Sequence, residues 1–358
     1  MSETDFLNAI EATLADPARA DGEMGRRAQT VLRCAGWLDE GHARRGYLVG
    51  MDLGGTKLLA ALATPDGSIV AEWEAATKDY PNGPLGQVDD MVAKLLAKGG
   101  VTLDQVAQIV IGVPGVVARD GSVSLSPHVD FPAGQSFSAT LEDALGVPVA
   151  VDNDVNVAAF GEYASRRADG LHTLAFAALG TGIGMGLVVD GQVLRGVHGA
   201  AGELGVIPFG ADPAAAYAAN PGGAFEATVS TRGILARYRA AGGKAESVRA
   251  IFDAAEAGDR FAADVVDQSL RDLAIGLATV VALIDPGLIV LGGGIGARPG
   301  VAAKVESWLG RLVPTQCRVL PSQHGARAGL FGALAKARKL AIAGVARREV
   351  ELLRGAAA

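Results

Sequence analysis

The sequence predicts an α/β protein built from two related halves, and three observations support this prediction. Two segments far apart in the chain, 49–64 and 173–189, follow one plan: an apolar run, a glycine-rich turn and a second apolar run. This order indicates a β-hairpin in each segment. A third glycine cluster, within 288–296, follows another apolar run of strand length. Between these segments strand-like runs alternate with stretches of helical spacing, which is typical of parallel strands covered by helices.

Size and composition fit this fold class. The chain has 358 residues, enough for two domains with sizeable cores. Apolar residues make up 49% and charged residues 20%, which excludes a mainly disordered chain. The net charge of −7 argues against a nucleic-acid-binding protein, because such a protein needs a basic face.

Cysteine usage and the absence of targeting patterns predict a cytoplasmic protein. The two cysteines, Cys34 and Cys317, are far apart and form no Cys-x-x-Cys pair, which argues against a disulfide framework or a thiolate zinc site. The N-terminus shows no basic region followed by an apolar core, so no signal peptide is expected. Uninterrupted apolar runs are too short to span a membrane, so no membrane partner is expected.

The first 45 residues stand apart from the rest. Apolar residues recur at helical spacing as far as Leu14, residues 17–25 break the pattern, and a second helix is expected over 31–38. Two short helices predict a packing arm or an oligomer contact. A DNA-binding helix-turn-helix is the alternative, but the segment is short and mixes acidic with basic residues.

The first half begins with the hairpin, and apolar spacing places a series of elements after it. An Asp-Gly turn is expected at 120–121, and a loop over 126–131. The expected elements are a strand over 68–73, a helix over 85–98, a strand over 106–113, a helix over 138–145, a strand over 147–151 and a helix over 157–162.

Polar residues gather where the last of these strands ends. Asp152, Asn153, Asp154 and Asn156 lie between the strand and the next helix. The carboxyl ends of parallel strands are the usual ligand position in α/β sheets. A helix N-cap explains one of the four residues but not all of them together. The sequence therefore predicts a polar ligand site here.

The second half contains two isolated acids and a long helix. Glu203 lies between glycines in the segment 196–205, and Glu226 lies at the start of a helix that follows an expected loop over 213–223. The remaining expected elements are a helix over 261–284 ended by Asp285-Pro286, a strand and turn over 288–296, and helices over 301–312 and 329–340.

The glycine turns indicate phosphate binding when they are taken together. Gly54 and Gly55 allow the backbone to adopt positive φ and allow amide N–H groups to approach an anion closely. One such cluster alone would indicate only a tight turn. Three clusters in this order, the first beside Asp52, favour an anionic ligand shared by two related halves.

Six motifs in order resemble the ROK family (repressors, open reading frames and sugar kinases) of the actin-like ATPase superfamily. They span the chain from about Tyr47 to about Leu340. The motifs are Asp52-Leu-Gly-Gly-Thr-Lys57, Gly112-Val-Pro-Gly115, Asn153-Asp-Val-Asn156, Leu179-Gly-Thr-Gly-Ile-Gly184, Gly199-Ala-Ala-Gly-Glu-Leu-Gly205 and Leu291-Gly-Gly-Gly294.

The resemblance implies two ribonuclease-H-like ATPase domains with a cleft between them and ATP-dependent phosphorylation of a hexose. It implies a helical extension over 1–45, an N-terminal domain over 46–152 and a C-terminal domain over 153–324. A C-terminal helix over 325–345 is expected to pack back on the N-terminal domain. A homodimer is the family default.

The resemblance also implies roles for individual residues. Asp154 would be the general base that takes the proton from the attacking sugar hydroxyl, since phosphoryl transfer depends mainly on positioning and charge neutralisation. Asn153, Glu203 and Glu226 would bind sugar hydroxyls. His128 would be either a substitute sugar contact or an ordinary loop histidine.

The cofactors implied by the resemblance are ATP and Mg²⁺. Asp52 would act on Mg²⁺ through water. The residues expected to bind phosphates are Gly54, Gly55, Thr56, Lys57, Gly180, Thr181 and Gly182, and those expected to border the nucleoside are Gly292, Gly293 and Gly294.

Two departures from the family pattern concern zinc. Most members have histidine where this chain has Val206, and a cysteine cluster where this chain reads Tyr217-Ala-Ala-Asn-Pro-Gly-Gly-Ala224. The histidine normally serves both the sugar and a structural zinc. Because all the zinc ligands are replaced together, a zinc-free branch is expected, and the identity of the sugar stays open.

Two other functions stay open as alternatives to a glucokinase-like enzyme. A sugar-responsive transcriptional regulator would share this core, with support only from the basic pairs Arg26-Arg27 and Arg44-Arg45. A sugar-binding protein without catalysis is suggested by Val206, although the presence of Asp154 argues against it.

Overall fold

The computed structural model describes residues 9–10, 12–13, 22–34, 37, 46–77, 80, 83–126, 129–166, 170–220 and 222–356. The chain divides into two compact units. The first comprises Met1–Val157 and Gly329–Ala358, and the second comprises Ala158–Ala328. Within the described ranges, every helix is too short or too polar to cross a membrane.

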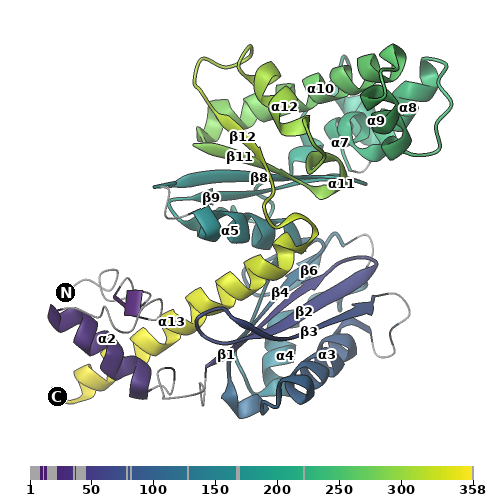
Figure 1. The fold of residues 1–358 in the computed structure, drawn as a ribbon. Helices are drawn as coiled ribbons and strands as arrows, with labels where there is room; N and C mark the ends of the chain where they lie inside the picture. The colour runs from purple at the N-terminus through teal and green to yellow at the C-terminus, as the bar shows by residue number, and fades with distance from the viewer. Residues whose placement is uncertain are drawn as a thin grey trace. The chain divides into compact units, whose positions relative to one another are not determined.

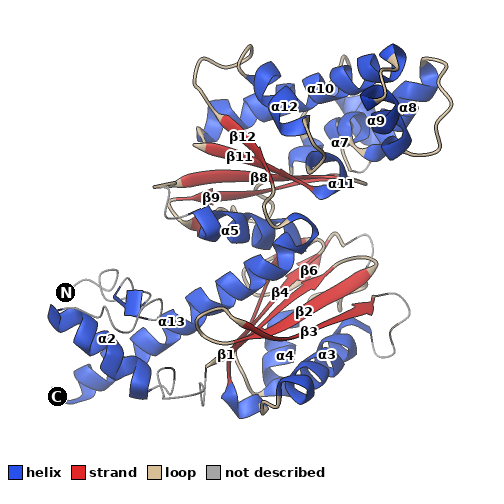
Figure 2. Cartoon of the chain, viewed as in Figure 1, coloured by secondary structure: helices blue, strands red, loops and turns tan. Residues whose placement is uncertain are grey.

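The first unit is built on a five-stranded sheet of order β3-β2-β1-β4-β7 (Figures 1 and 2). The first three strands form an antiparallel meander, and β4 and β7 continue the sheet in parallel with β1. The expected hairpin and buried strands are confirmed. The strands are β1 (Tyr47–Leu53), β2 (Lys57–Ala63), β3 (Ile69–Ala76), β4 (Val106–Val113) and β7 (Val149–Asn153), with a separate ribbon of β5 (Val116–Val117) and β6 (Val123–Ser124).

Helices cover both faces of this sheet. On one face α3 (Gly83–Gly99) and α4 (Phe137–Leu145) pack Met91, Leu95 and Phe137 against the strands. Gly146 ends α4 in the left-handed conformation, as its place in the sequence predicts. The opposite face is covered by α13 (Ala328–Ala356), which extends well beyond the predicted end at residue 345.

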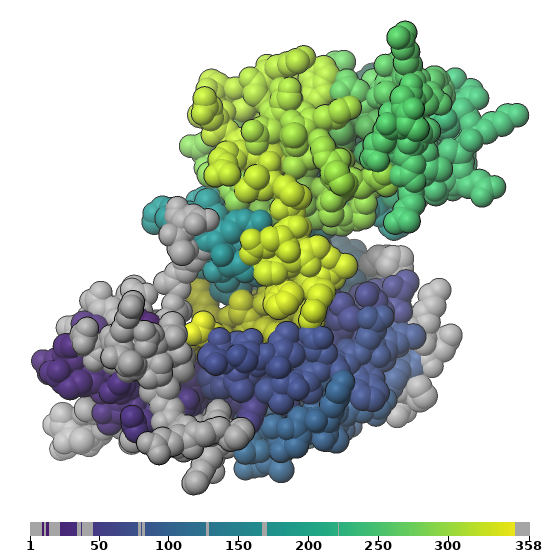
Figure 3. Space-filling model, viewed as in Figure 1, coloured from purple at the N-terminus to yellow at the C-terminus, as the bar shows by residue number. Residues whose placement is uncertain are grey.

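The N-terminal segment contributes a helix to the first unit. The helix α2 (Gly22–Cys34) begins inside the predicted break, so that boundary was wrong. Gly22, the first residue of α2, has a φ of 74°, and Ala28 and Leu32 share one buried apolar cluster with Ile342 and Val345 of α13. Figure 1 draws α2 beside α13, and Figure 3 shows α2 (purple) at the surface of the first unit. Tertiary packing on α13 therefore decides where this helix runs.

The second unit repeats the topology of the first, with sheet order β10-β9-β8-β11-β12. Again a meander, β10-β9-β8, is followed by two strands parallel to β8. The prediction of two related halves of ribonuclease-H-like topology is confirmed. The strands are β8 (Thr173–Leu179), β9 (Ile183–Val189), β10 (Gln192–Val193), β11 (Leu288–Gly292) and β12 (Arg318–Pro321).

The helices of the second unit confirm the predicted long helix and correct one loop. The segment expected as a loop over 213–223 contains α6 (Pro213–Ala219), because Asp212 caps it through the Ala215 N–H and proline occupies its first turn. The other helices are α7 (Ala224–Val229), α8 (Thr231–Ala240), α9 (Val248–Glu256), α10 (Arg260–Ile284), α11 (Gly293–Gly296) and α12 (Val301–Leu309).

Candidate functional site

The polar cluster at the end of β7 separates into different structural roles. Asp152 and Asn153 belong to the strand, and α5 (Asp154–Arg166) begins one residue later. Asp152 is only 1% exposed, and its carboxylate pairs with the buried ammonium of Lys336 on α13. Asp152 therefore serves the interior of the first unit, whereas the sequence suggested a ligand contact for it.

Asn153 caps α5 and fastens its start to a neighbouring loop. Its Oδ1 accepts hydrogen bonds from the N–H groups of Val155 and Asn156, both at 3.0 Å, and its Nδ2 donates to the Gly115 carbonyl at 3.0 Å. Both oxygen lone pairs are thereby engaged, so one N–H is left with which Asn153 can donate to a sugar hydroxyl.

Asp154 is the first residue of α5 and is half-buried. Its Oδ1 accepts the N–H of Val155 at 2.9 Å. An ideal β-carbon at Gly112 would lie 3.4 Å from the Asp154 α-carbon, so the end of β4 borders it closely. A carboxylate at the first position of a helix interacts favourably with the helix dipole.

Asp52 lies near the end of β1 in a desolvated position. Burial raises the pKa of its carboxyl to about 6, and the charge of Lys57 opposes that rise. No hydrogen bond to this carboxylate is found among the described residues. A hard, desolvated oxygen ligand without a competing donor fits Mg²⁺ or one of its bound waters.

The two glycine turns are held in the same way in both units. In the turn between β1 and β2, the Thr77 hydroxyl donates to the Gly54 carbonyl at 2.8 Å. In the turn between β8 and β9, the Thr231 hydroxyl donates to the Gly180 carbonyl at 2.8 Å. Thr56 and Thr181 are exposed at these turns. The same threonine anchor therefore fixes the glycine turn in both units.

Lys57 follows the first turn but is engaged elsewhere. Its ammonium lies 3.5 Å from a carboxylate oxygen of Glu74 on β3, and both side chains are exposed. An exposed pair of this kind contributes little to stability, so the lysine is free to exchange this partner for a phosphate.

Glu226 connects the second turn to the loop of Glu203. Its Oε2 accepts the Ile183 N–H at 3.1 Å, and its Oε1 lies 3.8 Å from Arg232. Although the Glu203 residue is exposed, desolvation of its carboxyl raises its pKa, and the nearby charge of Glu226 raises it further. Two carboxylates of like charge close together suit a ligand rich in hydroxyl donors.

Glycines surround the Glu226 side chain on three sides. Ideal β-carbons at Gly182 and Gly222 would lie 2.5 Å and 2.1 Å from its carboxylate oxygens, and one at Gly205 would lie 3.2 Å from its β-carbon. The same loops meet directly, because a β-carbon at Gly223 would lie 2.2 Å from the Gly205 carbonyl oxygen. The glycines therefore allow backbone and carboxylate to pack where a side chain would not fit.

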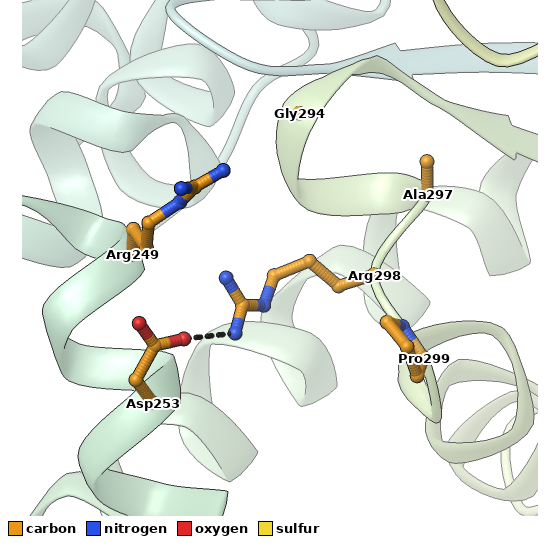
Figure 4. Close-up of a pocket in the computed structure, with 6 residues that line it drawn as sticks. All are labelled: Arg249, Asp253, Gly294, Ala297, Arg298 and Pro299. Carbon is orange, nitrogen blue, oxygen red and sulfur yellow. Dashed lines mark hydrogen bonds and ion pairs between the residues drawn. The ribbon is translucent and has the colours of Figure 1, made fainter.

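A cavity of about 400 Å³ lies beside the third glycine cluster. Arg298 is held there by Asp253 at 2.5 Å and Glu256 at 3.1 Å, while Arg249 points into the same space (Figure 4). A β-carbon at Gly294 would meet open space, and one at Gly180 would lie 3.9 Å from the Gly294 N atom. The lining residues are Arg249, Asp253, Gly294, Ala297, Arg298 and Pro299.

The structure thus groups the predicted residues within each unit. Asp52, its turn, Asn153 and Asp154 belong to the first unit, and Glu203, Glu226, their turn and the third glycine cluster belong to the second. His128 lies outside the described residues. Gly292 and Gly293 do not offer open space, because β-carbons there would lie 2.5 Å from the Phe176 ring and 2.4 Å from the Leu179 carbonyl oxygen.

Sequence reasoning missed several residues that shape these groups. Lys336 has the appearance of a surface lysine in an alanine-rich helix, and no local pattern marks it as a partner of Asp152. The spacing of Gly329 and Gly332 on one helical face was the available signal for close packing of α13. Thr77, Thr231, Arg249 and Arg298 carried no signal of their own.

The repeated topology and the paired glycine turns define a protein of the actin-like ATPase class. The chain belongs to the ROK family, whose match covers residues 48–339. A glucokinase from Halalkalibacterium halodurans is 34% identical over 275 residues, which cover 70% of this chain and 80% of that enzyme.

Two solved structures show the extent of the shared fold. A ROK hexokinase from Thermus thermophilus has 30% sequence identity and a TM-score of 0.67, covering 81% of this chain and 97% of that one. A ROK family transcriptional regulator, a homologue of the E. coli MLC protein, has a TM-score of 0.80 and covers 98% of this chain and 99% of that one. Its 22% identity shows likeness of fold alone.

Proposed function

We propose that this chain is a sugar kinase that transfers the γ-phosphoryl group of ATP to a hexose hydroxyl, with the C6 hydroxyl of glucose or a related sugar as the acceptor. The observation that carries the proposal is the placement of Asp154 at the start of α5, where the Asn153 cap fixes the turn that presents it. The match to the ROK family and the identity with a glucokinase support the same activity.

The chemistry assigned to Asp154 is the acceptance of one proton. Its carboxylate would take the proton of the attacking hydroxyl as the sugar oxygen forms its bond to the γ-phosphorus and the bond from that phosphorus to ADP breaks. Glu203 and Glu226, which belong to the second unit, would accept hydrogen bonds from sugar hydroxyls. Asn153, which belongs to the first unit, would donate one.

The glycine turns are proposed to hold the donor. Backbone N–H groups near Gly54 and Gly180 would bind phosphate oxygens, and Lys57 would add a positive charge. Asp52 would hold Mg²⁺ through water, and the ion when bound would neutralise charge on the phosphates. The cavity beside Gly294 would take the nucleoside, whose base can stack on a planar guanidinium such as that of Arg249.

A coupled ADP-release assay with glucose, mannose, fructose, N-acetylglucosamine and N-acetylmannosamine tests the proposal. Turnover is expected with at least one sugar, and Asp154→Asn is expected to lower kcat by about 10²–10⁴-fold, because the proton acceptor is lost. Asp143→Asn is the matched control, since Asp143 is exposed on α4. Undiminished turnover by Asp154→Asn would exclude Asp154 as the base.

The absence of ADP release with all five sugars, in folded protein that binds ATP, would count against the kinase proposal. Calorimetric binding of a sugar without turnover would then indicate a non-catalytic sugar-binding protein. A gel-shift with DNA at low salt would test the regulator, whose support among the described residues is limited to the exposed Arg26 and Arg33 on α2.

We further propose that the protein needs no zinc. The loops that meet at Gly205 and Gly223 are joined by backbone contact and by the Glu226 side chain. A chelator is therefore expected to leave the melting temperature unchanged, with less than about 0.1 zinc per chain by elemental analysis. A fall in melting temperature that added zinc reverses would contradict this. A homodimer is also proposed, and light scattering of the purified chain would measure it.

A further inference from the structure

Two acids of the first sheet, Asp52 and Asp152, lie at the same level of the sheet and on the same face. Asp52 on β1 pairs in register with Gly112 on β4, and Gly112 pairs with Asp152 on β7. Residues in register on neighbouring strands point to the same face of a sheet. On that face lies α13, which contacts Asp52 through Gly329 and Asp152 through Lys336.

The contacts of α13 lie along one stripe of the helix. Gly329, Gly332 and Lys336 are spaced three and then four residues apart, so they share a face. A β-carbon at Gly332 would lie 1.9 Å from the Val157 carbonyl oxygen in the first turn of α5. The backbone of α13 is therefore in direct contact with the turn that carries Asp154.

A short series of contacts leads from Lys336 to Asp154. The ammonium pairs with Asp152 Oδ2, and Asp152 Oδ1 accepts the N–H of Asn153 at 3.0 Å. The Asn153 side chain in turn caps Val155 and Asn156. The final contact in the series is the Asn153 cap, which joins the residue before Asp154 to the two residues after it and so fixes the backbone on both sides of Asp154.

The pair is almost wholly removed from water, because Lys336 is 7% and Asp152 1% exposed. A buried carboxylate left without its counter-ion recruits water or moves towards it, since desolvation of a lone charge is costly. Such movement would occur two residues before the base. A displacement of about 1 Å in a reacting group can lower a rate by about a hundredfold.

We propose that Lys336 is a positioning residue for Asp154, and that it acts through its buried ion pair with Asp152. The proposal rests on the role proposed above for Asp154. Lys336 would touch neither the sugar nor the nucleotide, because its ammonium is buried against Asp152. It holds the end of β7, and with it the first turn of α5, in the geometry that presents the base.

The test compares Lys336→Met with the double variant Lys336→Met/Asp152→Asn. Lys339→Met is the matched control, because Lys339 lies three residues further along the same helix. The measurements for each protein are kcat and the KM for ATP with the sugar turned over by the unmodified chain, the melting temperature, and hydrogen exchange at the Val155 and Asn156 amides.

Lys336→Met is expected to lower kcat by about tenfold to a hundredfold while the KM for ATP stays within about twofold, because none of the proposed nucleotide-binding residues belongs to this series of contacts. Exchange at Val155 and Asn156 is expected to quicken. The double variant leaves no lone buried charge, so its melting temperature should recover. Its kcat should stay low and its exchange fast, because the Lys336–Asp152 link to α13 is still missing.

Recovery of kcat together with stability in the double variant would overturn the proposal, since the pair would then serve folding alone. A kcat for Lys336→Met equal to that of Lys339→Met would overturn it as well. If Lys336→Met does not fold, the double variant decides. If the unmodified chain phosphorylates no sugar, the kinase proposal fails separately, and unchanged exchange in the double variant would still overturn the positioning role.

Discussion

The carboxylate of Asp52 lies directly against the α-carbon of Gly329, in the first turn of α13. An ideal β-carbon at position 329 would lie 2.4 Å from one carboxylate oxygen and 2.8 Å from the other. The acid and the start of the helix can therefore occupy these positions only while residue 329 has no side chain. The positions of the proposed magnesium ligand and of the helix that carries Lys336 therefore both depend on the close contact between Asp52 and Gly329.

Gly329→Ala is expected to displace the Asp52 carboxylate and to lower kcat by about tenfold or more, because a phosphate-neutralising group loses its position. Gly344→Ala is the matched control, since a β-carbon there meets open space in the same helix. The control should raise stability by up to about 1 kcal/mol through helix propensity. Steady-state kinetics and thermal melting measure both effects, and full activity of Gly329→Ala would contradict the assignment.

Asp52→Asn is expected to stabilise the protein at pH 8 while impairing turnover. The folded-state pKa of about 6 lies above the ordinary aspartate pKa of 3.8, so the folded form binds the proton more tightly than the unfolded form does. Stability from this group is therefore present at low pH and falls as pH rises through about 4 to 6. Asp52→Asn removes this pH-dependent loss of stability, so its free energy of unfolding at pH 8 should be higher by about 1–3 kcal/mol.

Chemical denaturation of both proteins at pH 4 and pH 8 checks this sign. The advantage of Asp52→Asn should be largest at pH 8 and should shrink towards pH 4, where the wild-type carboxyl is largely protonated in the folded state. An advantage of the same size at both pH values would show that burial of the charge is not its cause.

Gly294→Ala is expected to raise the KM for ATP about tenfold with little change in melting temperature. Its β-carbon would point into space that the protein leaves open beside the cavity, so only a bound nucleoside would meet it. Gly292→Ala is the contrasting variant, because its β-carbon would lie 2.5 Å from the Phe176 ring and should destabilise the core. An unchanged KM for ATP in Gly294→Ala would place the nucleoside elsewhere.

Two substitutions at Glu226 separate charge from anchoring. Glu226→Gln keeps an oxygen that can accept the Ile183 N–H, so it should raise the KM for the sugar about tenfold and leave the KM for ATP nearly unchanged. Glu226→Ala removes the anchor of the turn as well, so both KM values should rise. Equal effects of the two variants on the KM for ATP would show that the turn does not depend on this hydrogen bond.

The sequence by itself determined the fold class, the two related halves and most element positions. Apolar runs of strand length, the helix-ending Gly146 and the long run that ends at Asp285-Pro286 are local signals, and the structure follows them. The six motifs also indicated the family. These features are readable because periodicity and turn chemistry act between residues that are close in sequence.

Only the tertiary structure decided how the acids are used. Asp152 and Asp154 look alike in the sequence, but one pairs with Lys336, 184 positions away, and the other stands at the start of a helix. The start of α2 and the helix over part of 213–223 likewise depended on packing and on capping geometry. Such outcomes follow from burial and from the partners that the fold supplies, because the cost of a buried charge depends on what surrounds it.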